Sequence, residues 1–361
     1  MLRTLKTSVL LRHLTLALLG IVAIVVVVES ASDYGSVQLA SMAYLAIAAG
    51  GLTMLTGLNG QLSLGHGAFL AIGAYTTAVV LQKASDTPIL VVLVVATVVT
   101  TVIGGVVGVA AARLHGPYVA GATLALAIGV PGLAIYFDEF LGGEQGLNVR
   151  APDVPDWLGD LAFFLTGNEM SVSKYMAYLG WFCLVVVFVL LANLSAGRVG
   201  RRWRAVRDDE VAASLAGINL GRTRIQSFVV STACAGLAGA IMALSVRITA
   251  PSGFPLTLSL LLLSAIVLGG LGSLVGALIG AALLTYLPPA VTDLGSSAGL
   301  TDIQAAELTP LIYGLTTIAV ILLAPTGLVG IVGALLRRRS QPRDDQAQIR
   351  NDQPGSKEIR Q

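Results

Sequence analysis

The 361-residue sequence has little charge. Asp, Glu, Lys and Arg together make up 12% of the residues, whereas hydrophobic residues make up 55% and the mean hydropathy is +0.83. A soluble protein carries about twice that charged fraction. The composition therefore excludes a large soluble domain and predicts an all-α polytopic membrane protein with polar parts limited to loops and tails.

Residues that carry enzymatic chemistry are also scarce. The two cysteines, Cys183 and Cys234, lie inside apolar runs and have no metal-ligand spacing. No G-x-x-x-x-G-K-[ST] loop is present for nucleotide phosphates, and no apolar run contains the Asp, Glu and Lys set of a proton relay. We therefore expect no catalytic residue, bound metal, cofactor or nucleic-acid partner, and any energy source must lie outside this chain.

Long uncharged runs predict the membrane spans. A spanning helix needs about 20 apolar residues. The runs at 34–82 and 248–292 contain no Asp, Glu, Lys or Arg, and each is long enough for two crossings. Single crossings are expected at 14–28, 88–112, 119–137, 175–194, 225–246 and 308–336. The total is about ten transmembrane helices.

Basic and acidic loops predict the orientation. Arg3, Lys6 and Arg12 place the N-terminus in the cytoplasm by the positive-inside rule. The acidic loop 138–174 is then external, and the arginine-rich loop 195–224 is cytoplasmic. Arg337 to Arg339 end the membrane domain 1–336 on the cytoplasmic side, and we expect a disordered cytoplasmic tail at 337–361.

Residues 57–75, GLNGQLSLGHGAFLAIGAY, put glycines and polar side chains at membrane depth. Irregular backbone survives there only inside protein or beside a water-filled cavity. We expect a broken or re-entrant segment inside the bundle, with a helix restarting near Gly67 whose N-terminal dipole receives an anionic solute group. The predicted path residues of this segment are Asn59, Gln61, Ser63, Gly65, His66 and Gly67. Alternatively, the polar side chains only satisfy backbone groups freed by the break.

A second glycine-rich segment, GGLGSLVGALIGAALL, begins at Gly269. Its Gly270, Gly272 and Ser273 are further candidates for the path. At an offset of 210 residues four positions match, namely Gly60 with Gly270, Ser63 with Ser273, Leu64 with Leu274 and Ala71 with Ala281. Paired interrupted segments in two halves of a chain are typical of internal repeats around a transport path. Chance similarity in an apolar background explains four matches equally well.

The basic loop 195–224 predicts a helix that begins near Asp208. Val206, Glu210, Ala213 and Gly217 would share one face of it, and the small residues would let a partner backbone approach. Arg204 and Arg207 lie nearby and could pair with acidic groups of that partner. The alternative is that these arginines only fix the topology.

The motifs of this loop and of the glycine-rich segments resemble one family. E-V-A-A-S-L-A-G-I, which begins at Glu210, resembles the EAA loop of ABC importer permeases. R-A-V-R-D-D-E, G-Q-L-S-L-G-H-G-A-F and G-P-Y-V-A-G-A-T-L are similar to segments of branched-chain amino acid permeases, in the form of the LivM-type subunit. Ala324 departs from the pattern, since an Arg often precedes the Pro-x-Gly-Leu there.

The resemblance implies a type II ABC importer-like fold and a non-catalytic subunit in the bacterial cytoplasmic (inner) membrane. Its implied partners are a homologous LivH-type permease, two cytoplasmic ABC ATPases that hold ATP-Mg, and an extracytoplasmic solute-binding protein. Branched-chain amino acids (Leu, Ile, Val) are the implied solutes. Urea, amides or aromatic acids stay open, as does a channel or secondary carrier that needs no ATPase.

Overall fold

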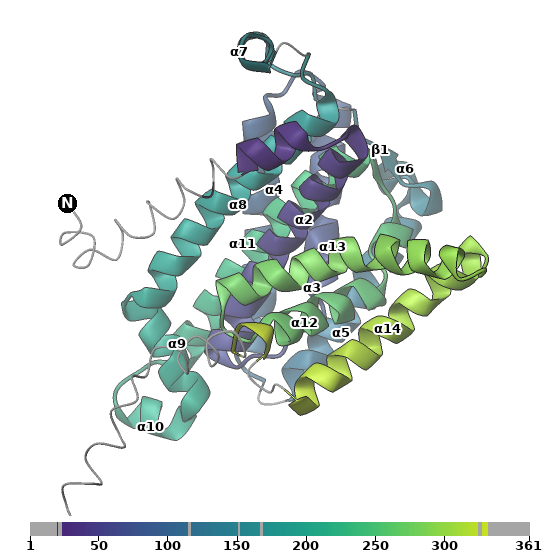
Figure 1. Ribbon diagram of the computed structural model, residues 1–361. Helices are drawn as coiled ribbons and strands as arrows, with labels where there is room; N and C mark the ends of the chain where they lie inside the picture. Colours follow the sequence, from purple (N-terminus) through teal and green to yellow (C-terminus); the bar gives the residue numbers. More distant parts are fainter. Residues whose placement is uncertain are drawn as a thin grey trace, which may run out of the picture.

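The computed structural model describes residues 20, 24–114, 117–150, 152–166, 169–323 and 327–330. In this part the chain is almost entirely helical (Figure 1). The elements of the first half are α2 (Asp33–Leu52), the π-helix η1 (Thr53–Leu58), α3 (His66–Lys83), α4 (Ile89–Ala111), α5 (Pro117–Tyr136), α6 (Asp138–Leu141), the 3-10 helix η2 (Gly143–Gln145), β1 (Leu147–Asn148) and α7 (Asp156–Thr166). The second half contains α8 (Val172–Ala196), α9 (Arg198–Asp208), α10 (Glu210–Leu215), α11 (Leu220–Val246), β2 (Ile248–Thr249), the 3-10 helix η3 (Pro251–Gly253), α12 (Leu256–Gly269), α13 (Leu274–Ser297) and α14 (Asp302–Leu323).

Seven helices of the described part are long and apolar enough to cross a membrane, which confirms a multi-pass protein. They are Asp33–Leu58, Ile89–Ala111, Tyr118–Tyr136, Val172–Ala196, Leu220–Val246, Pro251–Gly269 and Leu274–Ser297. The expected ten are not reproduced. The predicted first span lies mostly outside the described residues, and so does the end of the last one. The second half of the run 34–82 becomes α3, an 18-residue helix with polar residues at both ends, His66 at the start and Gln82 and Lys83 at the finish, and it is not among the seven.

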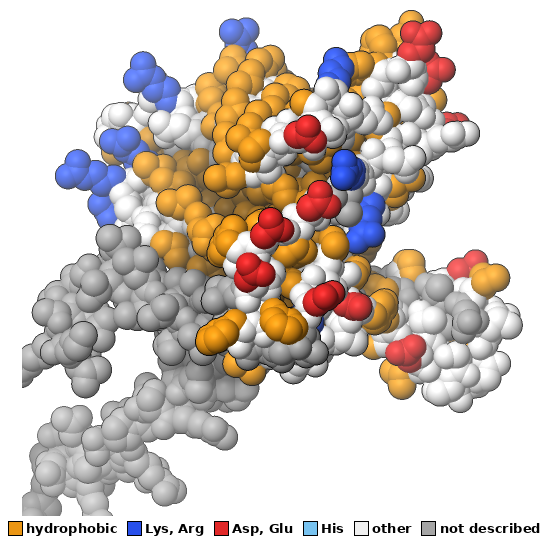
Figure 2. All heavy atoms as spheres, turned by 90° about the horizontal axis from the view of Figure 1, so that it is seen from above, with side chains coloured by type: hydrophobic (Ala, Val, Ile, Leu, Met, Phe, Trp, Pro, Cys, Tyr) orange, Lys and Arg blue, Asp and Glu red, His pale blue; other side chains and the backbone are white. Residues whose placement is uncertain are grey.

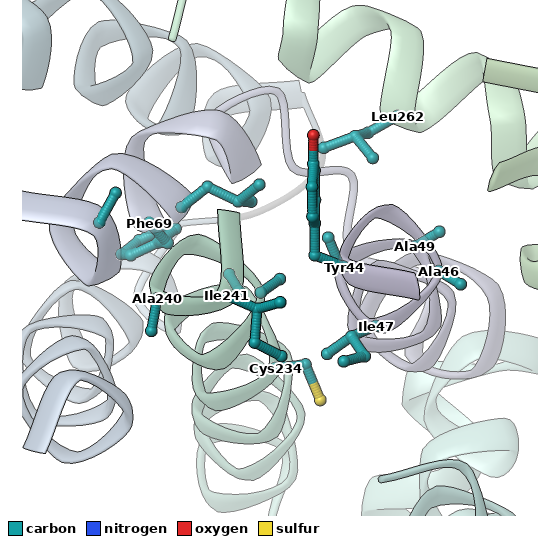
Figure 3. Close-up of a cluster of buried hydrophobic side chains, with 14 of the residues drawn as sticks. Tyr44, Ala46, Ile47, Ala49, Phe69, Cys234, Ala240, Ile241 and Leu262 are labelled. Atoms are coloured by element: carbon teal, nitrogen blue, oxygen red, sulfur yellow. The ribbon is translucent and has the colours of Figure 1, made fainter. Parts of the chain in front are cut away.

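Helix α11 lies at the centre of the bundle, where it packs against α2, α3 and α4. In Figure 3, Ile241 and Cys234 of α11 lie between Phe69 of α3 and Ile47 of α2. A side-chain carbon on Gly73 would overlap the backbone of Gly236. Such small residues let backbones approach closely, which is how helices associate where no water drives them together.

The polar segments lie at opposite ends of the bundle. Helix α7 stands at one end, and α9 and α10 lie at the other (Figure 1). A short ladder, in which Leu147 of β1 is the partner of Thr249 of β2, ties the predicted external loop 138–174 to the chain between α11 and α12. Seen from the α7 end, a group of acidic side chains lies on the surface (Figure 2). The predicted external and cytoplasmic loops therefore lie at different ends, while the basic N-terminal residues, Arg337 to Arg339 and the tail 337–361 are outside the described residues.

Candidate functional site

The predicted break is present between η1 and α3. The π-helix, a form often found at functional sites, widens the end of α2 and leads to Asn59. Gly60 then has a φ of 77°, a conformation that favours glycine. Helix α3 restarts at His66, one residue before the expected position. Most of the segment is buried, and Leu62 is its one large exposed side chain, at 49%.

Two polar side chains of this break bind α11. Asn59 Nδ2 donates to Ser227 Oγ at 2.7 Å, and Gln61 Nε2 donates to the same oxygen at 3.0 Å. Gln61 Nε2 also reaches the carbonyl oxygen of Arg224 at 3.2 Å. Asn59 Oδ1 and Ser63 Oγ are buried and have no partner among the described residues. The break is therefore held by polar contacts that leave two acceptors free.

The start of α3 is packed tightly against neighbouring helices. His66 is 1% exposed, and its Nε2 lies 3.0 Å from the carbonyl oxygen of Ala48. A carbonyl only accepts hydrogen bonds, so Nε2 carries the hydrogen. The Gly67 amide donates to Ser259 Oγ at 2.9 Å, and a side-chain carbon on Gly65 would overlap the carbonyl of Thr123. His66 thus hydrogen-bonds a buried carbonyl inside α2 and not one in the break, and its two predicted roles stay predictions.

The second glycine-rich segment is also a break, between α12 and α13. Gly270 and Gly272 have φ values of 124° and 81°, and Ser273 caps α13 by accepting from the Gly276 amide at 3.1 Å. A side-chain carbon on Gly57 would overlap the backbone nitrogen of Gly272. The two breaks, far apart in sequence, therefore meet in the bundle.

The arginine-rich loop 195–224 folds into two helices, so the predicted shared face is not formed. Asp209 interrupts the helix by accepting from the amides of Val211 and Ala212, at 2.8 and 2.9 Å. Val206 consequently belongs to α9 and is buried, and Gly217 lies beyond the end of α10 with a φ of 80°. An Asp in this position binds the free backbone amides of the next turn and so starts a new helix.

Helix α10 presents different residues from those expected. Ala213 is buried, whereas Val211 and Leu215 are 68% and 84% exposed. They are four residues apart and therefore lie on one side of the helix. The spacing of Val211 and Leu215 is visible in the sequence, but we predicted the contact surface from the small residues Ala213 and Gly217 instead. The surface that α10 offers is apolar and consists of Val211 and Leu215.

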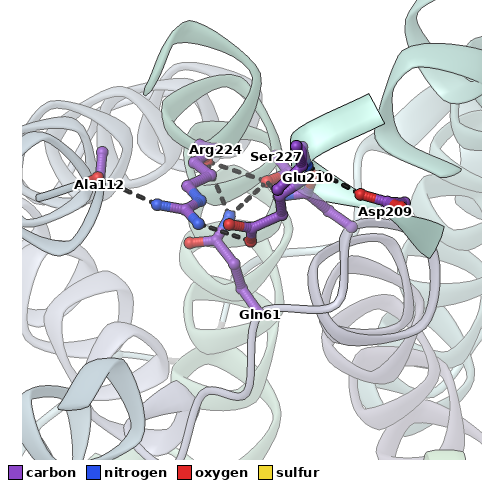
Figure 4. Close-up of polar contacts among 8 residues, drawn as sticks. Gln61, Ala112, Asp209, Glu210, Arg224 and Ser227 are labelled. Atoms are coloured by element: carbon purple, nitrogen blue, oxygen red, sulfur yellow. Dashed lines mark hydrogen bonds and ion pairs between the residues drawn. The ribbon is translucent and has the colours of Figure 1, made fainter. Parts of the chain in front are cut away.

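One charged residue of the loop, Arg224, is buried and joins Glu210 to the chain near Gln61 (Figure 4). Arg224, with 7% of its side chain exposed, pairs through Nη2 with Glu210 Oε1 at 2.5 Å. Arg207 donates from Nη1 to the carbonyl of Gly57 at 2.7 Å, so it is engaged within the chain. Arg204 is half-buried on α9. Arg224 was missed from the sequence, because fourteen positions and a helix boundary separate it from Glu210.

The arrangement of the breaks and of α9 and α10 is better suited to conformational change than to catalysis. In the part of the chain that the structure covers, no group of three or more His, Cys, Asp or Glu side chains could hold a metal ion. The site combines two helix breaks in contact, buried polar side chains, and a short helix that is connected to one break through Arg224.

The comparisons with known proteins agree with this arrangement. Residues 36–321 match the family described as "Branched-chain amino acid transport system / permease component". The high-affinity branched-chain amino acid permease LivM of Salmonella typhimurium is 30% identical over 328 residues, which cover 87% of this chain and 74% of LivM. BraD of Pseudomonas aeruginosa and LivH of Escherichia coli are each 28% identical, over 79% of this chain and 91% of their own length.

No solved structure matches the chain. The family match covers well over half of the sequence and includes both breaks and the loop with α9 and α10. The chain therefore belongs to the family of permease components of branched-chain amino acid transport systems.

Proposed function

We propose that this chain is the membrane-spanning, non-catalytic permease subunit of an ATP-driven ABC importer for Leu, Ile and Val. The observation that carries the proposal is α10, a short helix with exposed Val211 and Leu215 that is connected to the buried break through Arg224 of α11. An ATPase bound to this helix could displace it and so change the position of the residues connected to it. The family and the printed names of the relatives support the solute class.

The motor is a pair of cytoplasmic ABC ATPases that hold ATP-Mg. Val211 and Leu215 would lie in a groove of one ATPase, in the way that an amphipathic helix places its apolar side in a hydrophobic groove. Arg204 would reach acidic groups at the rim. Of the residues expected to couple the two proteins, Ala213 is buried, Glu210 is paired with Arg224 and Gly217 lies beyond the end of α10, so the contact is assigned to Val211 and Leu215.

The solute would cross beside the two breaks, and the path residues would be Asn59, Gln61, Ser63, Gly65, His66, Gly67, Gly270, Gly272 and Ser273. The N-terminus of α3 carries partial positive charge and suits an amino-acid carboxylate. In this conformation Ser259 occupies the Gly67 amide. Binding of a carboxylate there would require α12 to move away, and that movement is the step that ATP binding would drive.

Further subunits complete the importer. A LivH-type permease would supply the second half of the path, as in a type II ABC importer with re-entrant segments, and a solute-binding protein would dock at the α7 end. The chain would lie in the bacterial inner membrane with both termini and α10 in the cytoplasm. The arginines of α9 favour that orientation by the positive-inside rule.

The test is uptake of labelled leucine into proteoliposomes. We expect accumulation only when the chain is combined with the second permease, the ATPases, ATP and the binding protein. Urea and an aromatic acid serve as competing solutes. Leucine accumulation by the chain alone would favour a secondary carrier, and uptake of only a competing solute would reject the branched-chain assignment.

A further inference from the structure

Two arginines bridge the cytoplasmic helices and the buried breaks. Arg207 is near the end of α9 and Arg224 is in the first turns of α11. Each contacts the chain near α10 on one side and the first break on the other. No other charged residue in the described part of the chain makes a hydrogen bond to 57–66.

Arg224 connects α10 to the break through both its side chain and its backbone. Its guanidinium pairs with Glu210 and also approaches the carbonyl of Ala112, the residue that follows α4, at 3.4 Å. Its own carbonyl accepts from Gln61 Nε2 and from Ser227 Oγ, at 3.2 and 2.9 Å. Figure 4 shows these contacts as one connected group. A displacement of Glu210 thus acts on the residue that holds Gln61.

Burial makes this connection stiff. The Arg224 side chain is 7% exposed, whereas that of Glu210 is 47% exposed. Separation of the pair would leave a buried guanidinium without its counter-ion, which is strongly unfavourable. When α10 moves, Arg224 should therefore move together with Glu210, because separating the ion pair costs more free energy.

Arg207 provides a second connection, to the point where the two breaks meet. Its guanidinium is held by Asp208 Oδ1, at 3.0 Å from Nε and 2.8 Å from Nη2. Nη1 of the same group donates to Gly57, whose α-carbon faces the backbone of Gly272. The Arg207 Cγ lies 2.9 Å from where a side-chain carbon on Gly60 would be. Movement of α9 is thus passed to both breaks.

We propose that Arg224, paired with Glu210, is a positioning residue that transmits displacement of α10 to the first break, with Arg207 as the parallel connection from α9. This inference rests on the proposed function, since it assumes that an ATPase moves α10. It assigns Glu210 an inward role as the partner of Arg224, while the contact with the ATPase belongs to Val211 and Leu215.

The test separates transmission from docking. Leu62, exposed in the break, is replaced by cysteine (Leu62→Cys), and the rate at which this thiol reacts with a charged maleimide is measured in the assembled importer with and without ATP and vanadate. The parent chain without this substitution gives the background from Cys183 and Cys234. Arg224→Gln and Glu210→Gln are compared with Arg222→Gln, an exposed arginine on the same helix. ATPase association and basal ATP hydrolysis are measured for each.

We expect ATP to change the labelling rate at position 62 about fivefold in the Leu62→Cys importer, since couplings between sites are typically of this size or larger. The same change is expected when Arg222→Gln is added. Arg224→Gln and Glu210→Gln should keep ATPase association and basal hydrolysis but lose most of that change, together with uptake. Glu210→Gln keeps the test valid if the buried Arg224→Gln variant does not fold.

Two outcomes would overturn the proposal. One is that ATP changes the labelling rate at position 62 as much in Glu210→Gln as in the importer without that substitution. The other is loss of ATPase association in Glu210→Gln, which would make Glu210 a docking residue. An importer whose starting chain binds no ATPase would instead overturn the proposed function, before the arginines are tested.

Discussion

Gly57 of the first break and Gly272 of the second pack backbone against backbone, with no room for a side chain between them. The carbonyl of the same Gly57 accepts a hydrogen bond from Arg207 at 2.7 Å. One residue therefore links the two glycine-rich segments to the arginine-rich loop. A change in the position of α9 cannot reach one break without affecting the other.

Gly65→Ala should strongly reduce uptake. The added carbon would overlap the Thr123 carbonyl, and overpacking of this kind costs about 1–3 kcal/mol. Gly67→Ala should be milder, because its carbon would meet the Ser259 hydroxyl at 2.8 Å, and a hydroxyl can rotate. Leucine uptake per inserted molecule measures both. Gly129→Ala, where nothing lies within 4 Å, is the control, and equal uptake in all three would contradict the close packing.

Val211→Glu and Leu215→Glu should abolish association with the ATPase and leave the bundle folded. Each puts a carboxylate on the exposed apolar surface of α10, and burying it in a partner without a counter-ion is costly. Co-purification of the ATPase with the tagged chain is the measurement. Trp157→Glu, at an equally exposed position on α7, should retain the ATPase. Retention by both α10 variants would move the docking surface elsewhere.

His66→Gln should keep most uptake, and His66→Leu should lose it. A glutamine amide can still donate to the Ala48 carbonyl, whereas leucine cannot. The comparison is made by uptake and by the amount of chain in the membrane. If glutamine fails as completely as leucine, the imidazole has a role beyond this hydrogen bond.

Ser227→Ala should lower the unfolding temperature in detergent. The hydroxyl accepts from Asn59 and Gln61. Without it, Gln61 keeps its bond to the Arg224 carbonyl, but the Asn59 amide loses its partner, and an unpaired buried donor costs about 1–3 kcal/mol. Ser231→Ala, one turn along α11, is the matched control, because its oxygen is equally buried and has no partner among the described residues. An equal effect at the two positions would show that the contacts of Ser227 contribute nothing.

Acid should weaken the attachment of Glu29 to α8. Burial raises the pKa of this carboxyl, but hydrogen bonds from Tyr178 and Lys174 and the charge of Lys174 lower it further, so that the net pKa is below the ordinary 4.5. A lowered folded-state pKa stabilises the protein above the unfolded value and stops doing so as pH falls through the folded one. The unfolding temperature should therefore fall below pH 4.5, and less so in Glu29→Gln. Glu144→Gln, an exposed carboxyl, should follow the parent chain.

The positions of the breaks were predictable from the sequence, because glycine and polar residues inside an uncharged run leave little alternative at membrane depth. The helix restart was placed within one residue for the same reason. The number of spans was not predictable from charge alone. Helix α3 is uncharged before Lys83, yet His66, Gln82 and Lys83 make its two ends polar, and its place in the bundle follows from packing against α11, α4 and α5.

The arginine-rich loop 195–224 shows where sequence patterns are insufficient. The spacing of Val206, Glu210 and Ala213 fits one helix, but capping by Asp209 divides it in two, and a side-chain cap is a local competition that periodicity does not register. The contact between Glu210 and Arg224 depends on how α10 folds back on α11. Such a relationship is tertiary and has no signature in the spacing of the residues.

The interlocking of α3 and α11 sets a limit on how such a machine can work. Gly73 meets Gly236, and about one turn further along α11 Gly239 meets the backbone of Leu70. Two backbones in contact at two successive turns cannot slide or rotate past one another without first separating. Helices α3 and α11 should therefore move as one rigid unit, and a transport path would open and close through the helices that pack against this unit.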